Sequence, residues 1–151
     1  MSSFKDQTSF IRLNHYPPCP IPHLALGVGR HKDAGGLTIL AQDDIGGLEV
    51  QEGKTDGEWI RVKPTPDAYI IKCWKDTIQV WSNDEYESVE HRVVVNPERK
   101  RFSNSILLQS IALYLIEPWR SWANEKNPAK SKAYNWGMLF YSSEEQQFQE
   151  A

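Results

Sequence analysis

The sequence predicts an all-β fold, a sandwich or a jelly roll. Two observations support this prediction. Short segments rich in apolar and β-branched residues recur about every 8–12 residues with turn residues between them. No long segment before residue 110 has the apolar spacing of a helix. The length of 151 residues suits one hydrophobic core.

The expected strands follow in order along the chain. Residues 10–16 alternate and end at Pro17, because proline cannot donate to a sheet. After a break at Gly35 and Gly36, LTILAQ is expected to be a strand, DDIGG a turn and LEVQ the return strand. Further strands are expected at 58–64, 68–71, 77–81 (TIQVW), 87–96 and 101–109. We expect a barrel domain over 8–110 and a divergent tail over 111–151, short helical or irregular.

Composition argues against several functions. The formal net charge of -3 does not favour nucleic acid or an anionic membrane surface. No apolar run approaches the roughly 20 residues that a membrane helix needs. Two cysteines, Cys19 and Cys73, form no disulfide framework, and no secretion signal is visible. We expect a cytoplasmic monomer that acts on a small molecule.

Three separated residues suggest a metal site. His31 and Asp33 share a face if they lie on a strand, and His91 follows 58 residues later. Two histidines and one carboxylate make the facial triad of non-haem Fe(II) oxygenases, which leaves three positions open on the metal. A surface loop at His31 and Asp33, with His91 as an ordinary hydrogen-bonded histidine of a strand, remains an alternative.

Arg101 and Ser103 share a face on the strand after His91. A guanidinium binds a carboxylate through two hydrogen bonds, and a hydroxyl adds a donor. Tyr16 could supply another donor. Alternatively, Arg101 is a solvated member of the charged run PERKR. His15 is expected to face away from the site, and His23 to lie in a loop.

Several motifs together resemble a known family, the plant 2-oxoglutarate/Fe(II)-dependent dioxygenases, which include flavonol synthase and the gibberellin oxidases. The resemblance covers roughly residues 8–103 and resumes at 124–137. It implies a double-stranded β-helix, or jelly-roll, barrel. It also implies that His31, Asp33 and His91 are the catalytic iron ligands, that Arg101 and Ser103 hold 2-oxoglutarate, and that Tyr16 and Asn14 touch it. These motifs are NHYPPCP, RHKDAGGLTILAQDDIGGLEV, GEWIRVKPTPDAYII, IQVWSNDEYESVEHRVVVN and RFS.

The implied reaction uses Fe(II), O2 and 2-oxoglutarate to hydroxylate or desaturate a small organic molecule, with release of succinate and CO2. A related enzyme type oxidises aminocyclopropane carboxylate and uses ascorbate in place of 2-oxoglutarate. It shares the Arg-x-Ser pair, so ascorbate remains a candidate cofactor.

Three departures from the family predict a damaged fragment. The family's N-terminal region is missing, IIKCWKD replaces the shorter IINVGD, and RFSNSILLQS replaces RFSIPFFFNP. A back-translation of residues 104–110 shifted by one base reads IPFFFN, and similar shifts restore family-like sequence at 71–75 and 143–151. We therefore expect frameshifts, poor solubility and little activity. The open hypotheses are an active oxygenase, a catalytically incompetent fragment or pseudoenzyme that keeps the metal site, and a jelly-roll binding module with incidental histidines.

Overall fold

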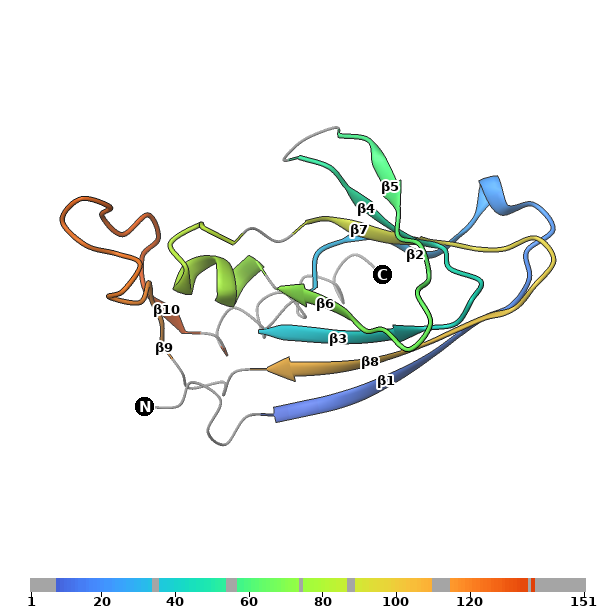
Figure 1. Cartoon of the computed structure of the whole chain (residues 1–151), viewed down its shortest axis with the longest axis horizontal. Coiled ribbons are helices and arrows are strands. Elements are labelled where there is room, and N and C mark those ends of the chain that lie inside the picture. Colours follow the sequence, from blue (N-terminus) through green and yellow to red (C-terminus); the bar gives the residue numbers. More distant parts are fainter. Residues whose placement is uncertain are drawn as a thin grey trace.

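The computed structural model describes residues 8–33, 36–53, 57–73, 75–86, 89–109, 115–135 and 137. Two four-stranded antiparallel sheets make up most of it (Figure 1). The major sheet has the strand order β1 (Thr8–Tyr16), β8 (Arg101–Gln109), β3 (Leu37–Gln42) and β6 (Ile70–Cys73). The minor sheet has the order β2 (Leu26–His31), β7 (His91–Val94), β4 (Leu48–Gln51) and β5 (Trp59–Arg61). The predicted all-β jelly roll is confirmed.

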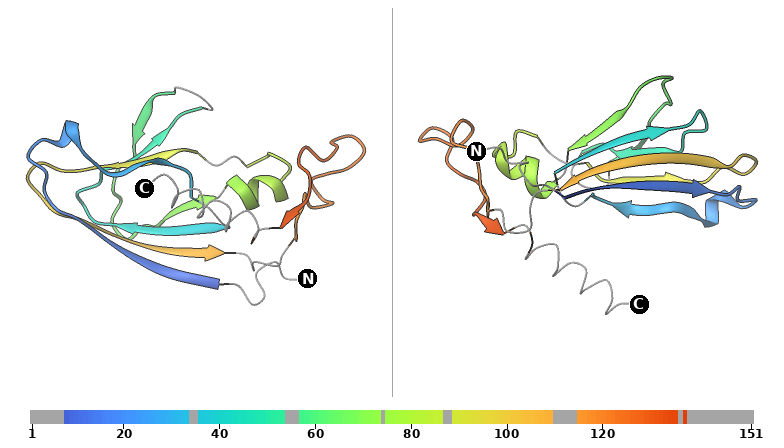
Figure 2. Two further views of the ribbon diagram at one scale, coloured as in Figure 1. Left: turned by 180° about the vertical axis from the view of Figure 1, so that it is seen from behind. Right: turned by 90° about the horizontal axis from the view of Figure 1, so that it is seen from below.

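The remaining elements are short. A 3-10 turn, η1 (Pro22–Leu24), follows the proline-rich segment after β1. A π-helix, η2 (Lys75–Gln79), and a two-stranded sheet of β9 (Leu115–Ile116) and β10 (Tyr134–Asn135) lie at one end of the molecule, beyond the ends of the long strands (Figure 2). No helix in the described part of the chain is long and apolar enough to cross a membrane.

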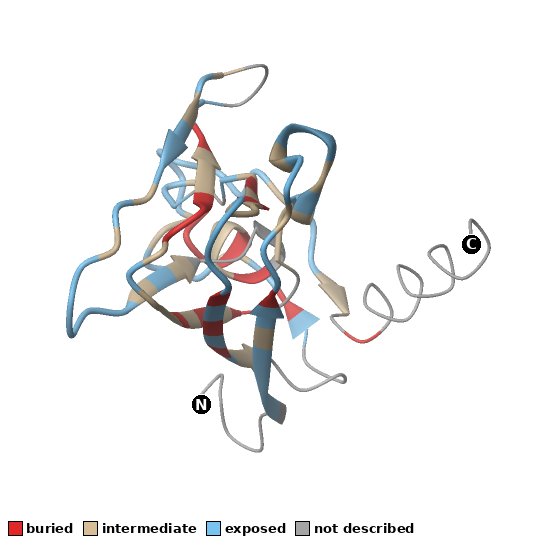
Figure 3. Cartoon of the chain, turned by 90° about the vertical axis from the view of Figure 1, so that its right-hand side faces the viewer, coloured by how far each residue is buried: buried red, intermediate tan, exposed pale blue. Residues whose placement is uncertain are grey.

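The core lies between the two sheets. Tyr16, Leu40, Leu48 and Val93 form its buried centre. They come from both sheets, because alternate residues of each strand point inward. The alternation of buried and exposed residues can be followed along the strands in Figure 3.

The register of the major sheet aligns one residue from each strand into rows. Ile11 of β1 pairs with Ile106 of β8, which pairs with Ile39 of β3, and Ile39 pairs with Ile71 of β6. These four isoleucines share the outer face. The neighbouring inward row runs from Phe10 through Leu107 and Thr38 to Lys72.

The expected hairpin between β3 and β4 does not form, and that prediction was wrong. β3 pairs with β6 and β8, whereas β4 pairs with β5 and β7 in the other sheet. The turn carries the chain from one sheet to the other. Gly46 and Gly47 have φ angles of 72° and 102°, which favour glycine. A Cβ on Gly47 would lie 2.6 Å from the carbonyl oxygen of Val94, so the crossover passes too close to β7 for a side chain.

The segment 77–81, expected as a strand, is helical, and that prediction was also wrong. Thr77, Val80 and Trp81 are buried, and their i, i+3, i+4 spacing marks one face of a helix. The N–H of Asp84 donates to the carbonyl of Gln79 at 2.8 Å, five residues earlier. A π turn takes up one residue more than an α turn.

A second, smaller core surrounds Trp81 and Ile116, which are 3% and 0% exposed. The Trp81 indole stacks on Trp119 with ring centroids 5.0 Å apart and planes 16° apart. Nearby, the side-chain amide of Asn83 donates to the carbonyl of Pro128 at 3.1 Å and accepts from the N–H of Lys130 at 2.8 Å. One buried amide therefore holds the 127–130 loop against the end of the helix.

Several predictions concern residues that the structure does not describe. The ending at 143–151, for which we expect a frameshift, lies outside the described residues, as do 110–114 and Trp74. Within 115–135 the chain forms turns and the two short strands, in keeping with an irregular tail. The division into a barrel over 8–110 and a tail over 111–151 stays a prediction.

Candidate metal centre

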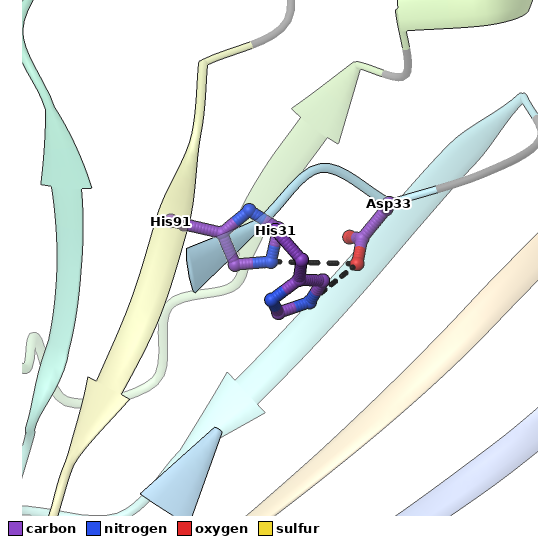
Figure 4. Close-up of side chains that lie close together, drawn as sticks. All are labelled: His31, Asp33 and His91. Carbon is purple, nitrogen blue, oxygen red and sulfur yellow. Dashed lines mark ion pairs between the residues drawn. The ribbon is translucent and has the colours of Figure 1, made fainter. Parts of the chain in front are cut away.

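Three side chains from the minor sheet converge on one point (Figure 4). His31 ends β2 and His91 begins β7, and the two residues are paired across the antiparallel ladder. Asp33 follows β2 by two residues. Its Oδ1 lies 3.4 Å from Nε2 of His31 and 3.4 Å from Nε2 of His91. One ligand atom from each residue lies within 4.8 Å of the other two. The predicted convergence is confirmed, whereas the ligand role stays a prediction.

A local hydrogen bond of His31 engages one ring nitrogen and leaves the other, Nε2, facing the cluster. Nδ1 of His31 lies 2.8 Å from the carbonyl oxygen of Gly29, so this nitrogen carries the proton and donates it. Nε2 faces Asp33. In the protonated ring Nε2 carries a proton for the carboxylate, and in the neutral ring its lone pair is available to a metal. Anchoring of the distal nitrogen by a backbone carbonyl is the usual way in which proteins orient a metal-binding histidine.

Burial and charge act against each other at these groups. Burial disfavours the ionised form of Asp33, but hydrogen bonding with His31 and the charge of Lys72 outweigh it and hold the pKa of Asp33 well below 3.8. The hydrogen bond with Asp33 raises the pKa of His31. Burial lowers the pKa of His91 and that of Lys72. The cluster therefore favours an ionised carboxylate beside a neutral His91.

The predicted anion-binding residues meet on the inner face of the major sheet. Nη1 of Arg101 donates to Oγ of Ser103 at 3.3 Å, and Nδ2 of Asn14 donates to the same oxygen at 3.3 Å. The guanidinium carbon lies 4.9 Å from the centroid of the Tyr16 ring, a cation–π contact. The second guanidinium nitrogen, Nη2, donates to Oε1 of Gln42 at 3.2 Å.

Arg101 is 2% exposed, and the nearby Tyr16 and Asp43 only partly offset the burial of its charge. Among the described residues, no carboxylate lies within ion-pair distance of it, and its Nε has no hydrogen-bond partner. Burial accordingly lowers the pKa of Arg101. A buried cation without a counter-ion costs several kcal/mol. An anionic ligand would offset that cost, and the free Nε–H points to a carboxylate held by two hydrogen bonds.

The His31–Asp33–His91 cluster and the predicted anion-binding residues line the same small cavity between the sheets. Its volume is ≈ 60 Å³. His31, Asp33 and His91 lie on one side, and Arg101 and Ser103 lie across it. Both groups therefore face one cavity, which at about the volume of two waters must widen to admit a dicarboxylate.

Sequence reasoning missed Lys72, which lines this cavity, and Gln42, which accepts a hydrogen bond from Arg101. Gln42 stands opposite Ser103 in the β3–β8 register, which single-strand alternation does not reveal. Nζ of Lys72 lies 2.5 Å from Oδ2 of Asp33 and 2.9 Å from Nε2 of His91. The sequence held a signal for Lys72, because this residue belongs to the segment IIKCWKD that departs from the family pattern.

The other two histidines lie where the sequence predicted. His15 is exposed on the outer face and stacks on Phe102 with ring centroids 4.7 Å apart. His23 is exposed in η1. Neither of them reaches the cavity.

Comparisons with known proteins agree with this geometry. A sequence model of the 2OG-Fe(II) oxygenase superfamily matches residues 7–110. Jasmonate-induced oxygenase 2 of Arabidopsis thaliana is 44% identical over 119 residues, which are 78% of this chain and 31% of that protein. Gibberellin 20 oxidase 2 of Oryza sativa subsp. japonica is 50% identical over 105 residues, 70% of this chain and 26% of that protein.

Solved structures show the same barrel. The crystal structure of JOX2 in complex with 2OG, Fe and JA superposes with a TM-score of 0.80 at 39% identity, covering 90% of this chain and 40% of that one. A rice dioxygenase for auxin oxidation gives a TM-score of 0.83 at 26% identity, covering 97% and 49%. The chain spans about a third of the length of the curated relatives it matches.

Proposed function

Because the chain belongs to the 2OG-Fe(II) oxygenase superfamily, we propose that it carries the Fe(II)- and 2-oxoglutarate-binding core of an oxygenase. The reaction is the hydroxylation or desaturation of a small organic molecule, with release of succinate and CO2. The proposal takes residues 8–110 as the working barrel.

One observation carries the proposal: Arg101 is buried, lacks a carboxylate partner among the described residues, and faces the cavity that also holds His31, Asp33 and His91. A binding module with incidental histidines gives no reason for a buried guanidinium without an ion-pair partner at that place. A dicarboxylate that spans the cavity explains both ends of it. The residues present therefore fit a metal together with an organic acid.

Each group has a role in this proposal. His31, Asp33 and His91 hold Fe(II) on one face and leave the opposite face for ligands. Bound iron supplies the redox chemistry with O2. Arg101 and Ser103 bind the distal carboxylate of 2-oxoglutarate.

Three neighbouring residues position this anchor. The Tyr16 ring packs against the guanidinium of Arg101, and Gln42 and Asn14 fix its orientation and that of the Ser103 hydroxyl through their amides. The Ser103 hydroxyl accepts from both Arg101 and Asn14, so its own proton is free to be donated to a carboxylate.

Calorimetry under anaerobic conditions tests the binding step. With Fe(II) in excess, 2-oxoglutarate should bind to the chain, and removal of iron by a chelator should weaken that binding. Succinate release in air then measures uncoupled turnover and separates this reaction from the ascorbate-dependent type, which does not consume 2-oxoglutarate. Absence of 2-oxoglutarate binding at millimolar concentration would overturn the proposal.

A second candidate, a pseudoenzyme that binds 2-oxoglutarate without turnover, is favoured by Lys72. Its ammonium contacts two of the three residues proposed to hold iron. The same pair of measurements separates the candidates. A pseudoenzyme binds 2-oxoglutarate and releases no succinate, whereas an oxygenase binds 2-oxoglutarate and releases succinate.

A further inference from the structure

Lys72 enters the cluster from the major sheet, opposite the strands that carry His31 and His91. It lies on β6 and pairs in register with Thr38 of β3, whose side chain is 1% exposed. Because Lys72 and Thr38 lie in the row of the major sheet that faces inward, the lysine side chain extends across the barrel. Only 17% of the Lys72 side chain remains exposed, and it lines the same cavity as Arg101.

The ammonium interacts with the same atoms that a metal would use. Nζ lies 2.9 Å from Nε2 of His91 and 2.5 Å from Oδ2 of Asp33. An ammonium has donors and no acceptor, so Nε2 of His91 must accept with its lone pair. A neutral imidazole nitrogen has one such lone pair. Nε2 can therefore accept from Lys72 or bind a metal, but it cannot do both.

Charge leads to the same exclusion. Two cations that share Asp33 and His91 would lie within a few ångström of each other in a mostly buried cavity. Coulomb repulsion between a divalent and a monovalent ion at such a separation disfavours their binding at the same time. No described carboxylate besides Asp33 lies within ion-pair distance of Lys72 to offset this repulsion.

We propose that Lys72 is a built-in competitor for the metal: its ammonium occupies the cation position of the His31–Asp33–His91 cluster, and a divalent ion binds only after the side chain has withdrawn. The inference rests on the proposed function, because it takes these three residues as ligands. It adds that the lysine lowers metal affinity and holds the cluster together when metal is absent.

Binding of Mn(II) tests the proposal without relying on activity, because the spectrum of free Mn(II) in electron paramagnetic resonance weakens as the ion is bound. The full chain should bind Mn(II) about 10–100-fold more weakly than Lys72→Met, the range over which residues around a metal site change affinity. Lys63→Met is the matched control, because Lys63 is exposed outside the cavity. It should leave the affinity unchanged.

Two further variants make the result decisive. Lys72→Gln removes the charge but keeps a polar side chain, so it should also gain affinity and covers the case in which the methionine variant does not fold. Circular dichroism checks the fold of each variant. Asp33→Asn combined with Lys72→Met should lose the gain, which shows that the added binding uses the cluster.

Failure of this proposal can be distinguished from failure of the proposed function. Equal Mn(II) affinity in the parent chain, Lys72→Met and Lys72→Gln overturns the role of Lys72 and leaves the metal site in place. No Mn(II) binding by any of the folded proteins overturns both.

Discussion

The inner face of the major sheet buries polar and charged side chains beside its core residues, whereas its outer face exposes large apolar side chains. The inner face, turned toward the minor sheet, carries Thr38, Arg101 and Ser103, which are 1%, 2% and 4% exposed. The outer face carries Ile11 and Leu13, which are 68% and 74% exposed. Burial of these polar groups on the inner face costs stability, and the proposed function gives them a use in binding a ligand. The outer face has the composition of a surface that aggregates or meets another surface.

The largest expected effect lies on the inner face. Arg101→Ala should weaken 2-oxoglutarate binding by about 2–5 kcal/mol, the scale for removing one partner of a buried charge pair. Anaerobic calorimetry with excess Fe(II) measures it. Arg99→Ala is the control, because Arg99 forms its ion pair with Asp44 on the exposed surface. Equal affinities in the two variants would show that the inner face does not anchor the acid.

Two leucines allow the faces to be compared with the same substitution. Leu40 is 6% exposed in the central core, and Leu13 is 74% exposed on the outer face. Leu40→Ala should lower the free energy of unfolding by about 2–5 kcal/mol because it leaves a cavity. Leu13→Ala should change it by less than about 0.5 kcal/mol. Denaturant titration measures both, and similar losses would contradict the assignment of inside and outside.

Acid unfolding of the metal-free chain should depend on Asp33. Burial opposes its ionisation, but hydrogen bonding with His31 and the charge of Lys72 hold its pKa below the ordinary 3.8. As the pH falls, the unfolded chain therefore takes up this proton first. Asp33 contributes its full stability above the unfolded value and loses it progressively below.

The Asp33→Asn variant should therefore show a shallower loss of stability below about pH 4, followed by circular dichroism in acid titrations. Asp44→Asn, at a residue with 73% of its side chain exposed, should follow the parent chain. If the stability of Asp33→Asn falls as steeply with decreasing pH as that of the parent chain, the carboxylate does not stabilise the fold.

The smallest expected effect on folding comes from the outer row of isoleucines. Ile11→Thr with Ile71→Thr replaces two exposed apolar side chains and keeps their β-branched shape. Light scattering should show aggregation at a higher protein concentration, while the free energy of unfolding changes little. Val89→Thr, at an exposed site outside the sheets, is the control. Equal gains from the control would mean that the outer face has no special part in aggregation.

Much of the fold and of the candidate site could be predicted from the sequence, because period-2 alternation decides which residues share a face. Arg101 and Ser103 were placed together in this way, as were Asn14 and Tyr16. His31, Asp33 and His91 needed the combination of residue type and family pattern. In each case, one strand or one motif contained the information.

The predictions that were missed or wrong depend on how separate segments of the chain lie next to each other in the fold. Gln42 contacts Arg101 and Lys72 reaches the cavity because β3 lies between β8 and β6, a neighbour relation that no single strand encodes. The Gly46–Gly47 turn marks a change of direction, but a hairpin and a crossover use similar residues. Residues 77–81 were too short for strand and helix spacing to be separated, although the burial of Thr77, Val80 and Trp81 has helical spacing.

The stacked indoles of Trp81 and Trp119 have an optical consequence. Transition dipoles in two rings whose centroids are 5.0 Å apart couple and split their absorption, and this produces a paired positive and negative signal in circular dichroism. Loss of the stack on heating would remove that signal, and the pair lies in the smaller core, outside the barrel cavity. One spectrum could therefore follow the end of the molecule that carries η2 and β9 separately from the barrel, so that the order in which the two parts melt becomes measurable.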